Sequence, residues 1–177
     1  MPRIAYQPHD IQEPRDLVEA IRARRGGRLL NLDRMLLYSP PLAKGWNGFL
    51  RAVRTELALS PRLMEIAICS VATLNGAQYE FHHHAPELLK AGGTQAQVDA
   101  LRRLQTQEPD ASLFDAIERA VIRFTIEMTR DVRVTDATFS AVRAALRDDR
   151  LVVELAGVVA AYNMVSRLLV ALDVEPE

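Results

Sequence analysis

The chain has 177 residues, which suits one domain, and its 49% of apolar residues are enough for a sizeable core. Its 22 basic and 23 acidic residues give a formal net charge of −1, so nothing favours a nucleic acid or an acidic membrane surface as partner. The single cysteine, Cys69, excludes a disulfide within the chain and fits a reducing cytoplasm. The first residues contain no apolar run of the length that a signal peptide needs.

The N-terminal part is predicted to be an arm followed by short helices. About a dozen residues with prolines and no periodicity come first, and they indicate an extended arm. Apolar residues at helical spacing predict helices over 16–25 and 42–56, with a shorter apolar cluster over 29–38 between them. A glycine pair ends the first of these helices.

The rest of the chain is predicted to hold six more helices. Ser60 followed by proline indicates a helix start, and Thr94 with Gln97 forms a capping box. The expected ranges are 60–74, 77–91, 94–104, 112–129, 135–146 and 151–172. No run alternates apolar and polar residues for long enough to be a strand, so the expected fold is an all-α helical bundle. We expect one domain, 1–177, with the arm and short helices in 1–40 and the helical core in 41–177.

The last helix is the most apolar segment of the chain. It is interrupted by Glu154, Asn163 and Arg167, which makes it too polar for a membrane span and typical of a core helix. Several helices, this one above all, are apolar on more than one face. A domain of this size does not easily bury all of them, so we expect a homo-oligomer.

The candidates for chemistry gather around three consecutive histidines, residues 82–84. On a helix, Glu80 and His84 share one face, and Tyr79 and His83 share a neighbouring one. Consecutive histidines point about 100° apart, so they cannot all serve one site.

Glu65 lies on the preceding predicted helix among apolar neighbours, where a lone carboxylate is costly to bury without a partner. The turn at 75–76 joins the two helices in antiparallel fashion and lets Glu65 approach His84. Glu65, Glu80 and His84 would then surround one polar pocket and could transfer protons, because each perturbs the pKa values of the others.

Plainer interpretations stay open for the same residues. Glu80 and His84 on an exposed face would form only a weak, solvated pair. The three site residues could also bind zinc, iron or manganese, although their spacing is not diagnostic of a metal site. Cys69 lies in an apolar stripe, which is more typical of a buried small hydrophobe than of a nucleophile.

The string LSPRLMEIAICSVATLNGAQYEFHHHAPELLKAG, at residues 59–92, resembles the carboxymuconolactone decarboxylase family with its alkylhydroperoxidase D branch. A weaker similarity continues to the last helix, VVELAGVVAAYNMVSRLLVALDVE. In the redox branch the motif is Glu, eleven residues, Cys, two residues, Cys, three residues, His. Its Glu and His fall on Glu65 and His84, but its cysteines fall on Ala77 and Glu80.

Because both cysteines are missing, dithiol peroxidase activity is not expected. The resemblance instead implies the cysteine-less branch, which includes cofactor-free lactone decarboxylases that assemble into rings. It implies a lyase acting on a small organic acid or lactone, with Glu65, Glu80 and His84 as catalytic residues. It also implies dimers, trimers or hexamers. The length departs from the family, because about forty residues precede its core helices, and this extra arm could wrap a neighbouring subunit or cover the pocket.

The substrate carboxylates would need an arginine or hydroxyl partner. The candidate substrate-binding residues are Tyr79, His83, Tyr162 and Arg167. Arg167 could equally form a structural ion pair, and the two tyrosines could simply pack in the core. Four hypotheses therefore stand: a cofactor-free enzyme with a small-molecule substrate, a metal-dependent enzyme, a non-catalytic helical assembly protein, and a peroxidase that uses Cys69 alone.

Overall fold

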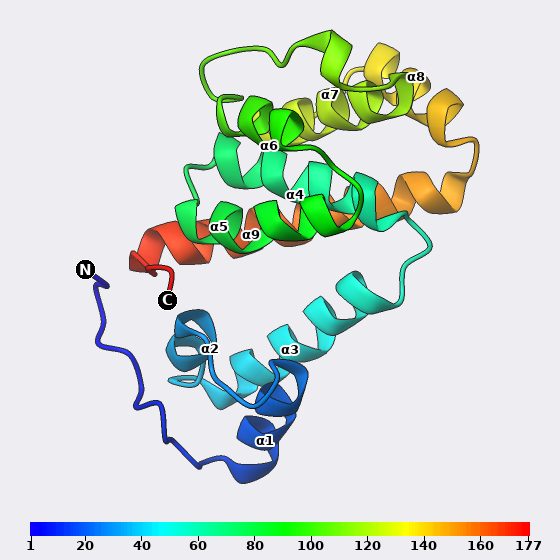
Figure 1. Ribbon diagram of the computed structural model, residues 1–177. Helices are drawn as coiled ribbons and strands as arrows, with labels where there is room; N and C mark the ends of the chain where they lie inside the picture. The colour runs from blue at the N-terminus through cyan, green and yellow to red at the C-terminus, as the bar shows by residue number, and fades with distance from the viewer.

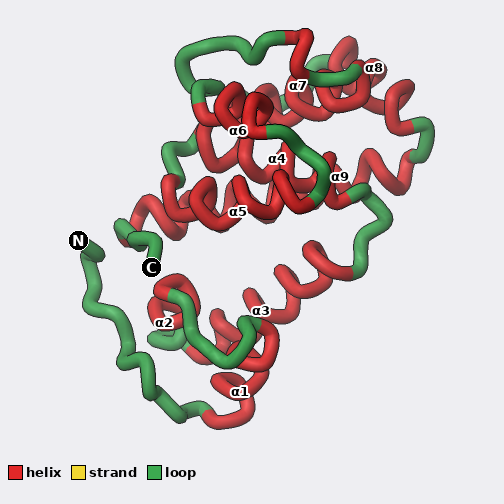
Figure 2. The backbone as a smooth tube through the Cα atoms, in the orientation of Figure 1, coloured by secondary structure: helices red, strands yellow, loops and turns green.

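The computed structural model describes all residues, 1–177, and its regular elements are all helical, as predicted. Figures 1 and 2 show nine α-helices joined by loops, with no strand. Their bounds are α1 Arg15–Arg24, α2 Asn31–Leu36, α3 Pro40–Thr55, α4 Pro61–Leu74, α5 Gln78–Lys90, α6 Gln95–Arg102, α7 Ala116–Arg130, α8 Asp136–Leu146 and α9 Asp149–Leu172. A short 3₁₀ turn, Ala111–Leu113, precedes α7.

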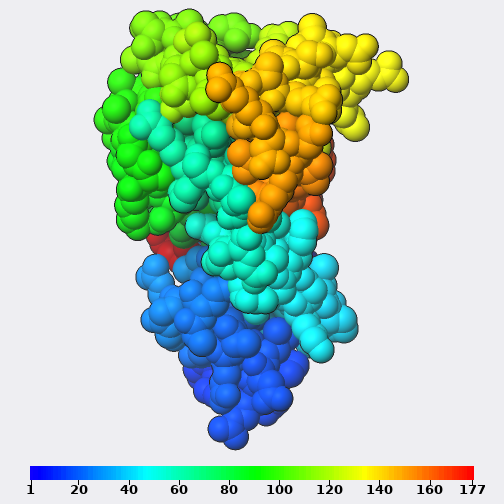
Figure 3. Space-filling model, turned by 90° about the vertical axis from the view of Figure 1, so that its right-hand side faces the viewer, coloured from blue at the N-terminus to red at the C-terminus, as the bar shows by residue number.

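The helices form two tiers that share one hydrophobic core. Helices α1 to α3 lie below the bundle of α4 to α9 in Figure 1, and the space-filling view in Figure 3 shows the two tiers in contact. The core of 43 buried residues runs through both tiers. Helix α3 packs against α1 and α2 and also against α9, so it joins the two tiers.

Helix α4 is the centre of the bundle. It packs against α5, α6, α7 and α9, and every residue from Met64 to Ala72 is buried. A helix that is apolar all round is typical of such a central position. Glu65 is the one charged residue in this buried stretch, so it needs a partner from a neighbouring helix.

Contrary to the expectation from its three polar residues, helix α9 is long and apolar enough, by length and composition alone, to cross a membrane. In the structure it packs against α4, α7 and α8, and its buried face includes Tyr162 and Ser166. A buried core helix meets the same criterion of length and composition.

Most predicted helix starts agree with the structure, but that of α7 does not. Ser60, Thr94 and Thr135 cap their helices as predicted. The helix expected from 112 starts at Ala116, because Asp115 and Glu118 form a capping box there. The Asp115 carboxylate accepts a hydrogen bond from the backbone N–H of Glu118, and the Glu118 carboxylate accepts one from the N–H of Asp115.

The N-terminal arm, which has no helix before residue 15, lies along its own chain. Its backbone N–H at Arg3 donates to Leu172 O at the end of α9, and its carbonyl at Ala5 accepts from Tyr38. The hydroxyl of Tyr6 accepts a hydrogen bond from the N–H of Glu175. The arm therefore holds the C-terminal segment in place.

Candidate active site

Glu65 and His84 meet across the antiparallel pair of α4 and α5. The His84 Nδ1 atom lies 2.6 Å from Glu65 Oε2, and each side chain is only 8% exposed. This contact gives the buried carboxylate the partner that it needs. The turn at Asn75 and Gly76 sets the register of the two helices, as the sequence suggested.

Arg54, on α3, is the third member of this cluster, and sequence reasoning missed it. Its Nη1 lies 3.2 Å from His84 Nε2 and 3.4 Å from the Tyr162 hydroxyl, and its Nη2 lies 3.8 Å from Glu65 Oε1. One signal was available, because Arg54 follows the core residue Leu50 by four and so continues the buried face of α3.

These contacts determine the protonation of His84. A guanidinium has only donors, so His84 Nε2 must be the acceptor of the Arg54 N–H. The imidazole is then neutral, and its proton lies on Nδ1 and is donated to Glu65. Burial lowers the pKa of His84 and outweighs the opposing effect of Glu65. The Tyr162 ring packs edge-on against the imidazole, with 4.9 Å between ring centroids.

Glu80 is buried nearby but has a different partner. Both of its carboxyl oxygens accept from the Ser166 hydroxyl on α9, at 3.1 and 3.0 Å. Burial raises the pKa of Glu80 well above its usual range, which favours the protonated carboxylic acid over the carboxylate. Glu80 faces the same cavity as His84 but makes no direct hydrogen bond to Glu65 or His84, unlike the close cluster that was expected.

The cavity is small and basic. Its volume is about 60 Å³, and it lies where the lower tier meets α5 and α9. Apolar side chains form much of its wall, and Arg24, Arg25 and Arg54 all reach it. Asp33 is the acidic partner of Arg24 and Arg25, at 3.5 and 3.1 Å. Three arginines reaching one small cavity are suited to holding an anionic ligand.

Tyr79 and His83 form the outer end of the cavity, where they contact Glu177 of the C-terminal segment. The Tyr79 hydroxyl donates to Glu177 Oε1 at 3.3 Å, and His83 Nε2 lies 2.9 Å from Oε2 without hydrogen-bond alignment. The backbone N–H of Asn31 also donates to this carboxylate. Glu177 therefore occupies a place at which a carboxylate is recognised by several donors.

Arg167, a predicted substrate-binding residue, and His82, which precedes His83 in sequence, lie outside the cavity. Arg167 is exposed on α9 and donates to Asn163 O and Oδ1, at 3.0 and 2.6 Å, so its position does not support a role in substrate binding. It forms no ion pair either. His82 points to the opposite side of α5.

The geometry does not favour the two alternative chemistries, a metal site and a peroxidase that uses Cys69. No three potential metal ligands converge on one point, and the Arg54 cation occupies the free nitrogen of His84. Cys69 is fully buried, and burial together with the nearby Glu65 carboxylate raises the pKa of its thiol. A thiol held in its neutral form is a poor nucleophile.

Comparisons with known proteins agree with this helical architecture. The model of the carboxymuconolactone decarboxylase family matches residues 40–121, which include Arg54, Glu65, Glu80 and His84. No curated protein matches the sequence.

Solved structures match over almost the whole chain, at identities that show the fold alone. A peroxidase-related protein from Ralstonia eutropha JMP134, described as an alkylhydroperoxidase AhpD core, is 17% identical with a TM-score of 0.84, and the match covers 99% of this chain and 92% of that one. The debrominase Bmp8, as a variant bound to 2,3,4-tribromopyrrole, is 18% identical with a TM-score of 0.79, covering 98% and 92%. A peroxidase-related protein from Silicibacter sp. TM1040 is 19% identical with a TM-score of 0.78, covering 99% and 89%.

Proposed function

We propose that the chain, whose residues 40–121 match the model of the carboxymuconolactone decarboxylase family, is a cofactor-free lyase that decarboxylates a small organic acid or lactone by proton transfer. The observation that carries this proposal is that a neutral imidazole and a buried carboxyl group with a raised pKa line one cavity. His84 is neutral with a free basic nitrogen once Arg54 turns to a ligand, and Glu80 is a neutral acid. Groups whose environments separate their pKa values in this way suit acid and base roles.

Each step of the reaction has a residue that suits it. When the carbon–carbon bond to the carboxylate breaks, carbon dioxide leaves and its electron pair forms an enolate on the substrate. Arg54 can donate to the enolate oxygen, and the apolar wall receives the carbon dioxide. Glu80 then gives its proton to carbon. A proton from solvent then restores Glu80. His84 Nε2, one helical turn along α5, can accept this proton and pass it through water to the Glu80 carboxylate.

This scheme assigns roles that the sequence left open or placed elsewhere. Among the three expected catalytic residues, Glu80 is the proton donor, because the only proton on His84 is held by Glu65. Arg54, rather than Arg167, is the arginine that holds the substrate anion, because Arg167 lies outside the cavity.

The proposal is tested by measuring carbon dioxide release from a panel of carboxylated lactones and small keto acids. Glu80→Gln keeps the shape and a hydrogen bond to Ser166 but has no acidic proton, so kcat should fall by about 10²- to 10⁴-fold. Arg54→Ala should lower kcat/KM by a similar factor. Arg167→Ala is the matched control and should leave both unchanged. Full activity of Glu80→Gln would contradict the proposal.

The small cavity volume favours one competing function, a non-catalytic helical protein. About 60 Å³ holds about two waters, at roughly 30 Å³ each, which is too little for a lactone acid unless a wall moves. The enzyme proposal therefore requires that the segment carrying Glu177 can be displaced. A chain that releases no carbon dioxide from any member of the panel, before or after removal of the Glu177 side chain, would favour the non-catalytic function.

A further inference from the structure

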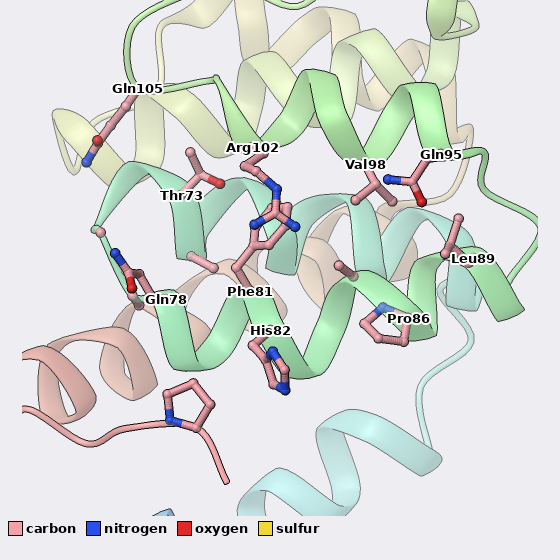
Figure 4. Close-up of a pocket in the computed structure, with 15 residues that line it drawn as sticks. Thr73, Gln78, Phe81, His82, Pro86, Leu89, Gln95, Val98, Arg102 and Gln105 are labelled. Carbon is pink, nitrogen blue, oxygen red and sulfur yellow. The ribbon is translucent and has the colours of Figure 1, made fainter.

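A second and larger cavity lies on the other side of α5. It is a groove of about 750 Å³ between α5 and α6, shown in Figure 4, and its volume falls in the range of small-molecule sites, about 300–1,000 Å³. None of its fifteen lining residues is acidic. The groove holds none of the residues assigned to the active site.

Helix α5 separates the two cavities, because side chains on its opposite faces line different cavities. Phe81, His82 and Ala85 line the groove, whereas Glu80 and His84 line the active-site cavity. A ligand in the groove therefore does not have to compete with one in the active site.

Arg102 is the only charged residue among those that line the groove. Its guanidinium lies 4.5 Å from the centroid of the Phe81 ring, on which it stacks in Figure 4. It makes no hydrogen bond or ion pair with any other residue, in contrast to Arg62 on α4, which pairs with Glu118 at 2.6 Å. An arginine that is held by an aromatic ring and has no carboxylate partner keeps its planar set of N–H donors for a ligand.

The rest of the groove determines what kind of anion fits. Phe81, Ala85, Leu89 and Val98 form the apolar part of the lining, and Gln78 and Thr73 add neutral polar groups. One cation and an apolar wall suit a single carboxylate on a flat apolar body better than a multiply charged phosphate. We propose that the groove binds a small aromatic carboxylic acid, with the carboxylate on Arg102 and the ring against Val98 and Ala85.

Sodium benzoate is the probe, titrated into the ¹⁵N-labelled full-length protein and followed by backbone amide shifts. We expect saturable shifts along the groove faces of α5 and α6, and acetate should bind roughly tenfold more weakly because it lacks the apolar body. Arg102→Ala should weaken benzoate binding roughly tenfold or more, since a charge-assisted hydrogen bond is lost. The neighbouring Arg103→Ala is the control, because Arg103 does not line the groove.

Arg54→Ala distinguishes this site from the active site. If the groove binds benzoate, the shifts along α5 and α6 persist in Arg54→Ala and vanish in Arg102→Ala, while Arg103→Ala behaves as wild type. The proposal is overturned if wild type shows no saturable binding, if Arg102→Ala binds as well as wild type, or if Arg54→Ala alone removes the effect. The test needs no turnover, so it stands apart from the proposed lyase activity.

Discussion

At the scale of single residues, the protonation of Glu80 has a consequence for stability. Burial raises the pKa of Glu80 well above its usual range, so the native state keeps a proton that the unfolded chain loses above about pH 4.3. The native state then binds more protons than the unfolded state, and the free energy of unfolding falls as pH rises. The slope is about 1.4 kcal/mol per pH unit until the native pKa is reached.

Glu80→Gln removes this slope. Relative to wild type, the variant should gain at least about 1.4 kcal/mol between about pH 5 and about pH 8, or about 2–4 °C in Tm for a chain of this size. Because His84 is neutral in the native state, both proteins should lose stability as pH falls below about 6.5, and that loss cancels in the difference.

Thermal unfolding across this pH range is the measurement for Glu80. Glu108→Gln, an exposed loop residue without a hydrogen bond, is the control and should track wild type. A constant difference between Glu80→Gln and wild type at every pH would show that Glu80 is ionised in the native state.

The sequence could predict part of this residue-level arrangement. The antiparallel helices and the spacing of Glu65 and His84 are local features, so their contact was foreseeable. The contacts of Arg54 and Ser166 come from α3 and α9, which lie far away in sequence, and no local pattern sets where they dock. The partner of a buried polar group is therefore harder to predict than its need for one.

At the scale of elements, the C-terminal segment after α9 lies against two residues that line the cavity. Glu177 contacts Tyr79 and His83, while the carbonyl of Glu175 accepts from Asn31 and its N–H donates to Tyr6. The segment is not helical and is held by a few polar contacts, so its displacement from Tyr79 and His83 should cost little free energy.

Removing the Glu177 carboxylate should therefore ease the entry of other carboxylates. Glu177→Ala should bind acetate in the active-site cavity roughly tenfold more tightly than wild type, because the Glu177 carboxylate no longer competes for the same donors. A tenfold lower Kd corresponds to about 1.4 kcal/mol of binding free energy. The affinity is read from the NMR shifts of His83 and His84. Glu175→Ala is the control, because its carboxylate pairs with the N-terminal amine outside the cavity. Equal acetate affinities in all three proteins would mean that the Glu177 carboxylate does not compete with ligands for the site.

The start of a helix was predictable where the sequence has an N-capping side chain, as at Ser60, Thr94 and Thr135. The start of α7 was wrong because apolar periodicity alone placed it before the capping box of Asp115 and Glu118. Capping chemistry outweighs periodicity at a helix end, since the first backbone N–H groups need acceptors.

At the scale of the whole molecule, the outer face of α9 has no partner in the chain. Val153 is 71% exposed and Met164 is 40% exposed, and with Ala160 they lie on one side of the helix. We propose that this face is buried in a homo-oligomer, which was also the expectation from the apolar composition of the helix.

Light scattering on protein eluting from size exclusion tests this proposal. The mass should be a multiple of 19.8 kDa, and Met164→Glu should shift it toward the monomer by placing a charge in the interface. Phe139→Glu, an exposed apolar residue on α8, is the control. A monomer at about 10 µM, well above the Kd of a stable oligomer, would contradict it.

The two-tier arrangement of the molecule places the acid and the base of the proposed reaction in one cavity, between α3 below and α5 and α9 above. The most direct test is to run the decarboxylation in D₂O and measure the amount of product that wild type and Glu80→Gln form with carbon-bound deuterium. Our mechanism predicts one deuterium per product from wild type, and almost no product from Glu80→Gln. Equal amounts of deuterated product from both proteins would mean that the proton does not come from Glu80, and the proposed mechanism would be wrong.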